Sequence, residues 1–215
     1  MTKATRFVLA IVLFGSLVGL FDLGGHDLVK AAGVEMKSPY LTALVFFVLI
    51  AARVLFDKPG STFLMGAVAG LFKLAGFVVL GRDVWVCQCG AVVIQAGVLD
   101  MFISLASSEK GLRLRVVLAA ALAACLVSYL GFVGLALSLN AGGQFSHWSH
   151  ISDYFSTRLP VALPVAAAAA LLGLFIGRSL RSGFGKIESR PAAYLASAVG
   201  AAVVAIAVLI LDLRR

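Results

Sequence analysis

Long apolar stretches separated by short polar segments dominate this chain. Roughly 17 to 25 consecutive apolar residues can cross a bilayer as a helix, and seven stretches approach or reach that length. They lie at residues 7–21, 39–56, 62–80, 85–107, 114–138, 160–180 and 191–212. None shows the alternating pattern, about ten residues long, of a membrane β-barrel strand. The pattern predicts an all-α fold, a polytopic transmembrane bundle of six to seven helices.

The composition supports a membrane protein. Hydrophobic residues make up 61% of the 215 residues and charged residues 13%, and the mean hydropathy is +1.05, so the chain is far more apolar than a soluble domain. Little sequence remains outside the apolar stretches, and we expect residues 1–215 to form a single integral membrane domain. The net charge of +8 is spread over short connections, which argues against a nucleic-acid partner.

The distribution of basic residues predicts the orientation. If the N-terminus is cytoplasmic, eleven lysines and arginines fall on the inner side and six on the outer side, as the positive-inside rule requires. Arg214 and Arg215 do not fit, because seven spans would leave them outside. We predict a protein of the bacterial inner membrane with a cytoplasmic N-terminus.

Three polar side chains interrupt the apolar stretches: Lys73, Gln95 and Asp100. A charge at mid-membrane costs at least ~2.5–3.5 kcal/mol, so it normally faces a partner or an aqueous cavity. At about 1.5 Å per residue, Lys73 and Gln95 reach the same depth on neighbouring antiparallel helices, and Asp100 lies roughly 7 Å further toward the cytoplasm. The long lysine stem spans part of that gap. We predict one polar cluster in which Lys73 pairs with Asp100.

Two interpretations of this cluster remain open. In the structural one, Lys73 and Asp100 only neutralise each other. In the functional one, the cluster binds a small polar solute from the outside, because small-molecule sites combine a few polar groups with an apolar pocket. The Lys73 ammonium would favour a carboxylate, phosphate or polarised carbonyl on that solute. The substrate-binding residues we expect are Lys73, Gln95, Asp100 and Trp148.

Two connections on the predicted outer side, residues 22–38 and 139–159, are much longer than those on the inner side. Long loops beside packed helices often serve as lids or binding loops. The second contains His147, His150 and Asp153, which are residue types that bind metals, although the histidines lack the four-residue spacing of a zinc-protease helix. These three are weak metal candidates, and we expect no cofactor.

Small residues recur at four-residue spacing in several apolar stretches. The pairs are Gly15 and Gly19, Gly66 and Gly70, and Gly173 and Gly177, and a longer series runs through Ala193, Ser197, Ala201 and Ala205. Small residues let helix backbones approach closely in lipid. Packing within the chain is the simpler explanation, and the last series equally suits a partner subunit.

Residues 1–182 resemble the substrate-binding S components of energy-coupling factor (ECF) vitamin transporters. The shared features are a cytoplasmic N-terminus, short inner turns and two long outer loops, the second preceding residues 159–180 (LPVALPVAAAAALLGLFIGRSL). Residues 58–76 (KPGSTFLMGAVAGLFKLAG) and 94–102 (IQAGVLDMF) are similar to parts of the third and fourth helices of that family. Residues 183–215 would then contribute an additional C-terminal transmembrane helix.

This resemblance implies a solute-binding subunit of an uptake transporter for a small molecule such as a vitamin or its precursor. It implies a pocket on the outer side and docking onto a coupling transmembrane subunit that is driven by two ATPases. The family's Ala-x-x-x-Ala docking motif is absent from the first helix, where Gly15 and Gly19 are the nearest equivalent.

Two other classes of function compete with transport. A structural or assembly subunit would use its small-residue faces to bind larger membrane partners. An integral membrane enzyme would need an acid-base or nucleophile set, and no such set stands at a recognised spacing here. We therefore expect a lipid-embedded protein that is not an enzyme.

Overall fold

A computed structural model describes residues 3–31, 33, 37–80, 86–106, 112–139 and 151–187. These ranges contain six α-helices and no strand. The helices are α1 (Lys3–Ala31), α2 (Lys37–Phe56), α3 (Ser61–Leu80), α4 (Val86–Ala106), α5 (Leu114–Ser138) and α6 (Ile151–Ile187). The all-α prediction is confirmed for these residues. The predicted span at 191–212 lies outside them.

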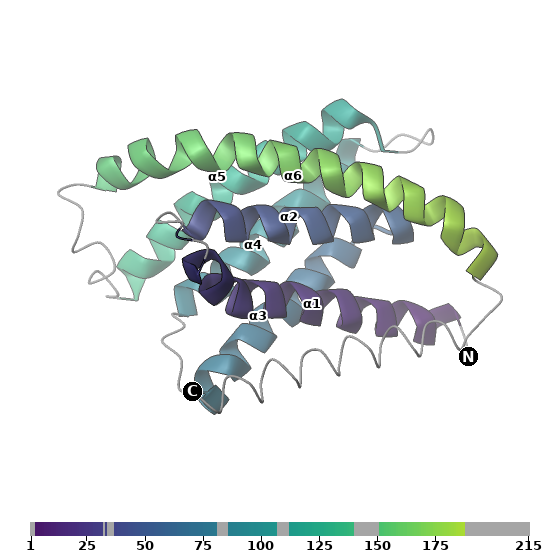
Figure 1. The fold of residues 1–215 in the computed structure, drawn as a ribbon, viewed down its shortest axis with the longest axis horizontal. Helices are drawn as coiled ribbons and strands as arrows, with labels where there is room; N and C mark the ends of the chain where they lie inside the picture. Colours follow the sequence, from purple (N-terminus) through teal and green to yellow (C-terminus); the bar gives the residue numbers. More distant parts are fainter. Residues whose placement is uncertain are drawn as a thin grey trace.

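The six helices form a ring. Neighbours pack in the order α1, α3, α4, α5, α6 and α2, which returns to α1, and α2 also touches α3 and α5. Figure 1 shows the longest helix, α6, running alongside α2. The span in α2 is 67% buried within the protein, compared with 33% for that in α6, so α2 is the most enclosed helix of the bundle.

Four helices are long and apolar enough to cross a membrane: α2, α4, α5 and α6. Two shorter apolar segments, Phe7–Asp22 and Ser61–Gly76, lie within α1 and α3. In α6 the apolar run lies between Arg158 and Arg178, a rise of about 30 Å at 1.5 Å per residue, which matches the thickness of the hydrocarbon core. The protein is therefore an integral membrane helical bundle.

Contacts between helix ends define the two ends of the bundle. At the first, which we call the arginine-rich end, Arg181 of α6 reaches the end of α2 and Arg178 donates to the Leu112 carbonyl before α5. The Lys58 ammonium lies 4.5 Å from the centroid of the Phe7 ring in α1. At the opposite end, the Tyr129 ring of α5 lies 6.1 Å from that of Tyr154 at the start of α6. Neighbouring helices in the sequence thus run antiparallel.

The turn between α2 and α3 follows the predicted break at Pro59 and Gly60. Asp57 adopts a left-handed backbone conformation (φ 44°) and donates its N–H to the Arg53 carbonyl at 2.9 Å, which is a common way to end a helix. Pro59 cannot continue α2. Gly60 (φ 83°) then leads into α3.

Two predicted outer loops are partly helical. Helix α1 continues to Ala31, so the loop expected over residues 22–38 is wrong for residues 22–31. A helical glycine costs about 1 kcal/mol, and here packing outweighs that cost, since a Cβ on Gly25 would lie 2.7 Å from Leu41 of α2. Helix α6 likewise starts at Ile151, eight residues before the predicted end of the second loop, and runs through Pro160 and Pro164.

The glycine pairs mediate contacts within the chain. A Cβ on Gly15 would lie 2.8 Å from the Met65 carbonyl oxygen of α3, and a Cβ on Gly19 would lie 2.9 Å from the Phe72 side chain. Gly66 and Gly70 meet α4 in the same way, and Gly173 and Gly177 meet α2. Close backbone approach at these pairs therefore supports three contacts of the ring, while the series from Ala193 to Ala205 lies outside the described residues.

Candidate functional site

The polar side chains inside the bundle fall into two groups. Lys73, Gln95, Asp100 and Arg53 are only 2–5% exposed, so each needs a polar partner within the protein. Lys73 and Gln95 lie in the half of the bundle nearer the opposite end. Asp100 and Arg53 lie near the arginine-rich end. The single three-residue cluster predicted from the sequence is therefore wrong.

Lys73 pairs with Asp22 of α1. The Lys73 Nζ lies 2.5 Å from Asp22 Oδ2, and both side chains are nearly enclosed. The glycine contacts of α1 explain this pairing, because Gly19 brings the helix backbone against Phe72, the residue before Lys73. Asp22 lies almost one turn beyond Gly19, on the same face of α1. The ammonium is thus neutralised by a neighbouring helix and not by Asp100.

Gln95 belongs to a group of uncharged polar contacts near the opposite end. Its Nε2 donates to the Thr42 carbonyl of α2 at 3.3 Å. Ser38 Oγ and Tyr129 Oη form a hydrogen bond of 3.0 Å between α2 and α5. The Tyr154 ring stacks against Phe132 at 6.2 Å between centroids, and its centroid lies 5.9 Å from the Arg158 guanidinium. This end therefore offers amide, hydroxyl and aromatic groups.

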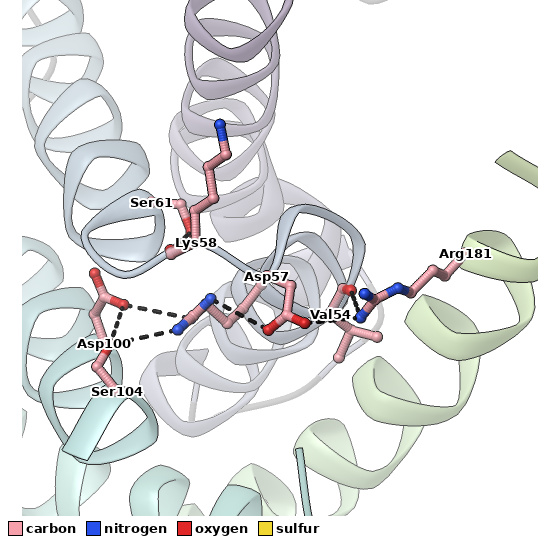
Figure 2. Close-up of polar contacts among 8 residues, drawn as sticks. Val54, Asp57, Lys58, Ser61, Asp100, Ser104 and Arg181 are labelled. Carbon is pink, nitrogen blue, oxygen red and sulfur yellow. Dashed lines mark hydrogen bonds and ion pairs between the residues drawn. The ribbon is translucent and has the colours of Figure 1, made fainter. Parts of the chain in front are cut away.

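Asp100 pairs with Arg53 near the end of α2. Arg53 Nε lies 3.4 Å from Asp100 Oδ1, and Arg53 Nη2 donates to Ser104 Oγ at 3.4 Å. Asp100 Oδ2 accepts the backbone N–H of Phe63 at 3.3 Å. Since Phe63 lies in the first turn of α3, Asp100 satisfies one of the donors that a helix start leaves open. Figure 2 shows Asp100 and Ser104 of α4 facing this arginine of α2.

The charged network extends to α6 through Asp57. Arg53 Nη1 lies 3.8 Å from Asp57 Oδ1, and Arg181 Nη1 lies 3.1 Å from Asp57 Oδ2. Arg181 also donates to the Val54 carbonyl at 3.3 Å. Figure 2 shows Asp57 between the two guanidinium groups. Two basic and two acidic side chains therefore connect the ends of α2, α4 and α6 with the start of α3.

The error in the predicted Lys73–Asp100 pair has a simple physical origin. Helix rise gave the depths of the two side chains but not the direction in which each one points. Asp22 fell within the expected loop 22–38, and Arg53 was only one of the eleven basic residues counted on the inner side, although Asp22 adjoins an apolar stretch and Arg53 lies within one. Both partners were visible in the sequence as charged residues at or within an apolar stretch, but the depth of a side chain does not show which of them it faces.

The remaining candidates lie mostly outside the described residues. Trp148, His147 and His150 fall in the range 140–150. Asp153 is in the first turn of α6. Among the described residues no group of three or more histidine, cysteine or acidic side chains is placed to hold a metal ion, and the role of these candidates in binding stays a prediction.

The arrangement differs chemically between the two ends. The arginine-rich end holds a network of ion pairs that bridges four helices, which suits a structural role. Among the described residues, the opposite end holds an enclosed ion pair and, on other helices, uncharged hydrogen-bonding and aromatic side chains, which are the kinds of group that small-molecule sites use.

Comparison with known proteins identifies the fold. A solved structure described as "Crystal structure of an S-component of ECF transporter" aligns over 86% of this chain and 85% of its own, with a TM-score of 0.56 and 20% sequence identity. No protein-family model matches the sequence, and no curated protein matches it. The chain therefore has the fold of an S component of an ECF transporter.

Proposed function

We propose that this protein is the membrane-embedded solute-binding subunit of an uptake transporter. The observation that carries the proposal is the likeness to an S component over nearly the whole length of both chains. Binding of a small molecule requires a few polar groups inside a largely apolar bundle, and Lys73, Asp22 and Gln95 supply them. The fold favours a transport subunit over the membrane enzyme considered from the sequence.

The distribution of charge supports an orientation for uptake. The arginine-rich end carries the exposed side chains of Lys58, Arg113, Arg115, Arg178 and Arg181, which the positive-inside rule assigns to the cytoplasm. The opposite end then faces the outside of a bacterial inner membrane. A solute such as a vitamin or its precursor would enter there, and Trp148 stays a predicted binding residue.

Energy for uptake would come from separate subunits. The S-component fold supports docking onto a coupling membrane protein with ATPases on the cytoplasmic side. The glycine pair at Gly15 and Gly19 is not available for that docking, because α3 covers it. A partner would have to use another surface of this chain.

A structural or assembly subunit is the second candidate. One observation favours it: the charged groups Lys73 and Asp100 both already have a partner inside the chain. Such pairs fix the register of helices without binding any ligand.

Binding of solute probes to protein in lipid nanodiscs tests the proposal. The probes are individual vitamins, nucleobases and divalent metal ions, measured by thermal shift and by retention after gel filtration. We expect at least one probe to be retained by the wild type and lost by Lys73→Met, whereas Lys58→Met, which removes an exposed lysine at the arginine-rich end, keeps it. Copurification with ATPases from the host would support transport.

The contrary outcome favours the second candidate. If no probe shifts the wild-type protein, and if Lys73→Met matches the wild type in growth of the host on limiting solute, the uptake function is wrong.

A further inference from the structure

The ion pair between Lys73 and Asp22 leaves no uncompensated charge at its position. The ammonium and the carboxylate are 2.5 Å apart, and their side chains are 6% and 10% exposed. Water therefore contributes little to their solvation, and each group depends on the other. An incoming anion would have to compete with a carboxylate that already holds the ammonium.

Charge is balanced in the sequence of the segments that we assign to the outer side. On α6, Asp153 and Arg158 add one acidic and one basic residue to the opposite end. The sequence over residues 22–37, 73–83 and 139–158 contains five acidic and five basic residues. By contrast, residues 1–6, 53–58, 100–115 and 178–190, at the arginine-rich end, contain four acidic and eleven basic residues.

Uncharged groups complete the local chemistry. Gln95 already donates to the Thr42 carbonyl, which leaves its amide oxygen and second N–H for another partner. Tyr129 and Ser38 share a hydrogen bond in which either hydroxyl can be the donor. These groups can exchange hydrogen bonds with a solute but cannot neutralise a net charge.

We infer that the solute carries no net charge, being either neutral or zwitterionic. This inference rests on the proposed uptake function. Transfer of a net charge into an enclosed site is costly unless an opposite charge compensates it, and the Lys73–Asp22 pair provides none. The anion preference expected from an isolated Lys73 is thereby replaced by a preference for uncharged molecules.

Matched probes that differ in charge test the inference. The pairs are nicotinamide with nicotinate, riboflavin with riboflavin 5′-phosphate, and pyridoxine with pyridoxine 5′-phosphate, each measured by equilibrium dialysis against the full chain in nanodiscs. For the pair that binds, we expect the wild type to prefer the uncharged member at least tenfold. Asp22→Asn leaves the ammonium unpaired and should move this ratio at least tenfold toward the anion.

Two variants control the experiment. Asp57→Asn removes a carboxylate at the arginine-rich end and should leave the ratio unchanged. The double variant Asp22→Asn, Lys73→Met is again uncharged at this position, so it should restore preference for the uncharged member. If Asp22→Asn alone does not fold, the binding ratio of the double variant is compared with that of the wild type instead.

The outcomes separate this inference from the function on which it rests. A wild type that prefers the anionic member, or an Asp22→Asn variant that folds and keeps the wild-type ratio, overturns the inference while uptake stands. Binding of no probe of either charge overturns both.

Discussion

Partners on other helices account for the charged residues that are buried in the described part of this bundle. Lys73 and Asp22 join α3 to α1, and Arg53 and Asp100 join α2 to α4. A buried ion pair seldom adds much net stability, because both groups lose their hydration. Loss of one partner is different, because the remaining charge stays buried without compensation.

The pairing of Lys73 predicts a specific stability pattern. Lys73→Met should lower the free energy of unfolding by about 3–5 kcal/mol, because it leaves Asp22 unpaired. Adding Asp22→Leu should recover part of this loss, since the double variant contains no unpaired charge. Denaturant-induced unfolding in detergent, followed for the two single variants and the double variant, gives the interaction energy.

Asp100 supplies the control for this experiment. Asp100→Leu combined with Lys73→Met should give two losses that add, because Asp100 pairs with Arg53 and not with Lys73. Recovery of stability by Asp100→Leu, and not by Asp22→Leu, would show that the assigned pairs are wrong.

At the scale of helices, close backbone contacts at glycine determine how the ring packs. A Cβ on Gly173 of α6 would lie 2.7 Å from the Phe47 carbonyl oxygen of α2, and a Cβ on Gly177 would lie 2.8 Å from Val54 Cβ. Backbone atoms cannot move aside as the end of a flexible side chain can. The contact between α6 and α2 therefore depends on these small residues.

A substitution at Gly173 tests this dependence. Gly173→Ala should lower the free energy of unfolding by about 1–3 kcal/mol, the usual cost of overpacking. Gly134 in α5 is the matched control, because a Cβ there would meet nothing within 4 Å. Gly134→Ala should leave stability unchanged or raise it by up to about 1 kcal/mol through helix propensity. Equal melting temperatures for the two variants would contradict the packing argument.

Hydrophobic pattern predicted most of the helices, because a bilayer imposes a minimum apolar length that is visible in sequence. The predicted range 114–138 coincides with α5, and 39–56, 62–80 and 85–107 match α2, α3 and α4 within two residues at each end. The pattern failed where helices extend into polar sequence. Residues 22–31 are helical because α1 packs against α2 there, a tertiary contact that local composition does not reveal.

The candidate site was predictable in composition but not in pairing. Lys73, Gln95 and Asp100 were identifiable because polar residues inside apolar stretches need partners. Which partner each one meets depends on helix rotation, and close contacts such as that of Gly19 with Phe72 set this rotation. Depths calculated from helix rise therefore cannot predict that two residues remote in sequence, such as Asp22 and Lys73, form a pair.

For the whole molecule, the difference in charge between the two ends supports the proposed orientation in the membrane. The arginine-rich end contains an excess of basic residues, whereas the sequence at the opposite end is balanced. Basic residues are retained on the cytoplasmic side during insertion. In the proposed orientation, the solute site would lie in the outer half of the bundle, as uptake requires.

Cysteine labelling in intact cells tests this orientation. In a background in which Cys87, Cys89 and Cys125 are replaced, Ser149→Cys should react with a membrane-impermeant maleimide, because the connection from α5 to α6 is at the end assigned to the outside. Lys58→Cys, in the turn between α2 and α3, should react only after the cells are permeabilised. Both variants should be labelled equally in detergent, which controls for accessibility of the thiol. The reverse pattern would place the balanced end in the cytoplasm, and a subunit with its polar pair on that side would not capture a solute from outside.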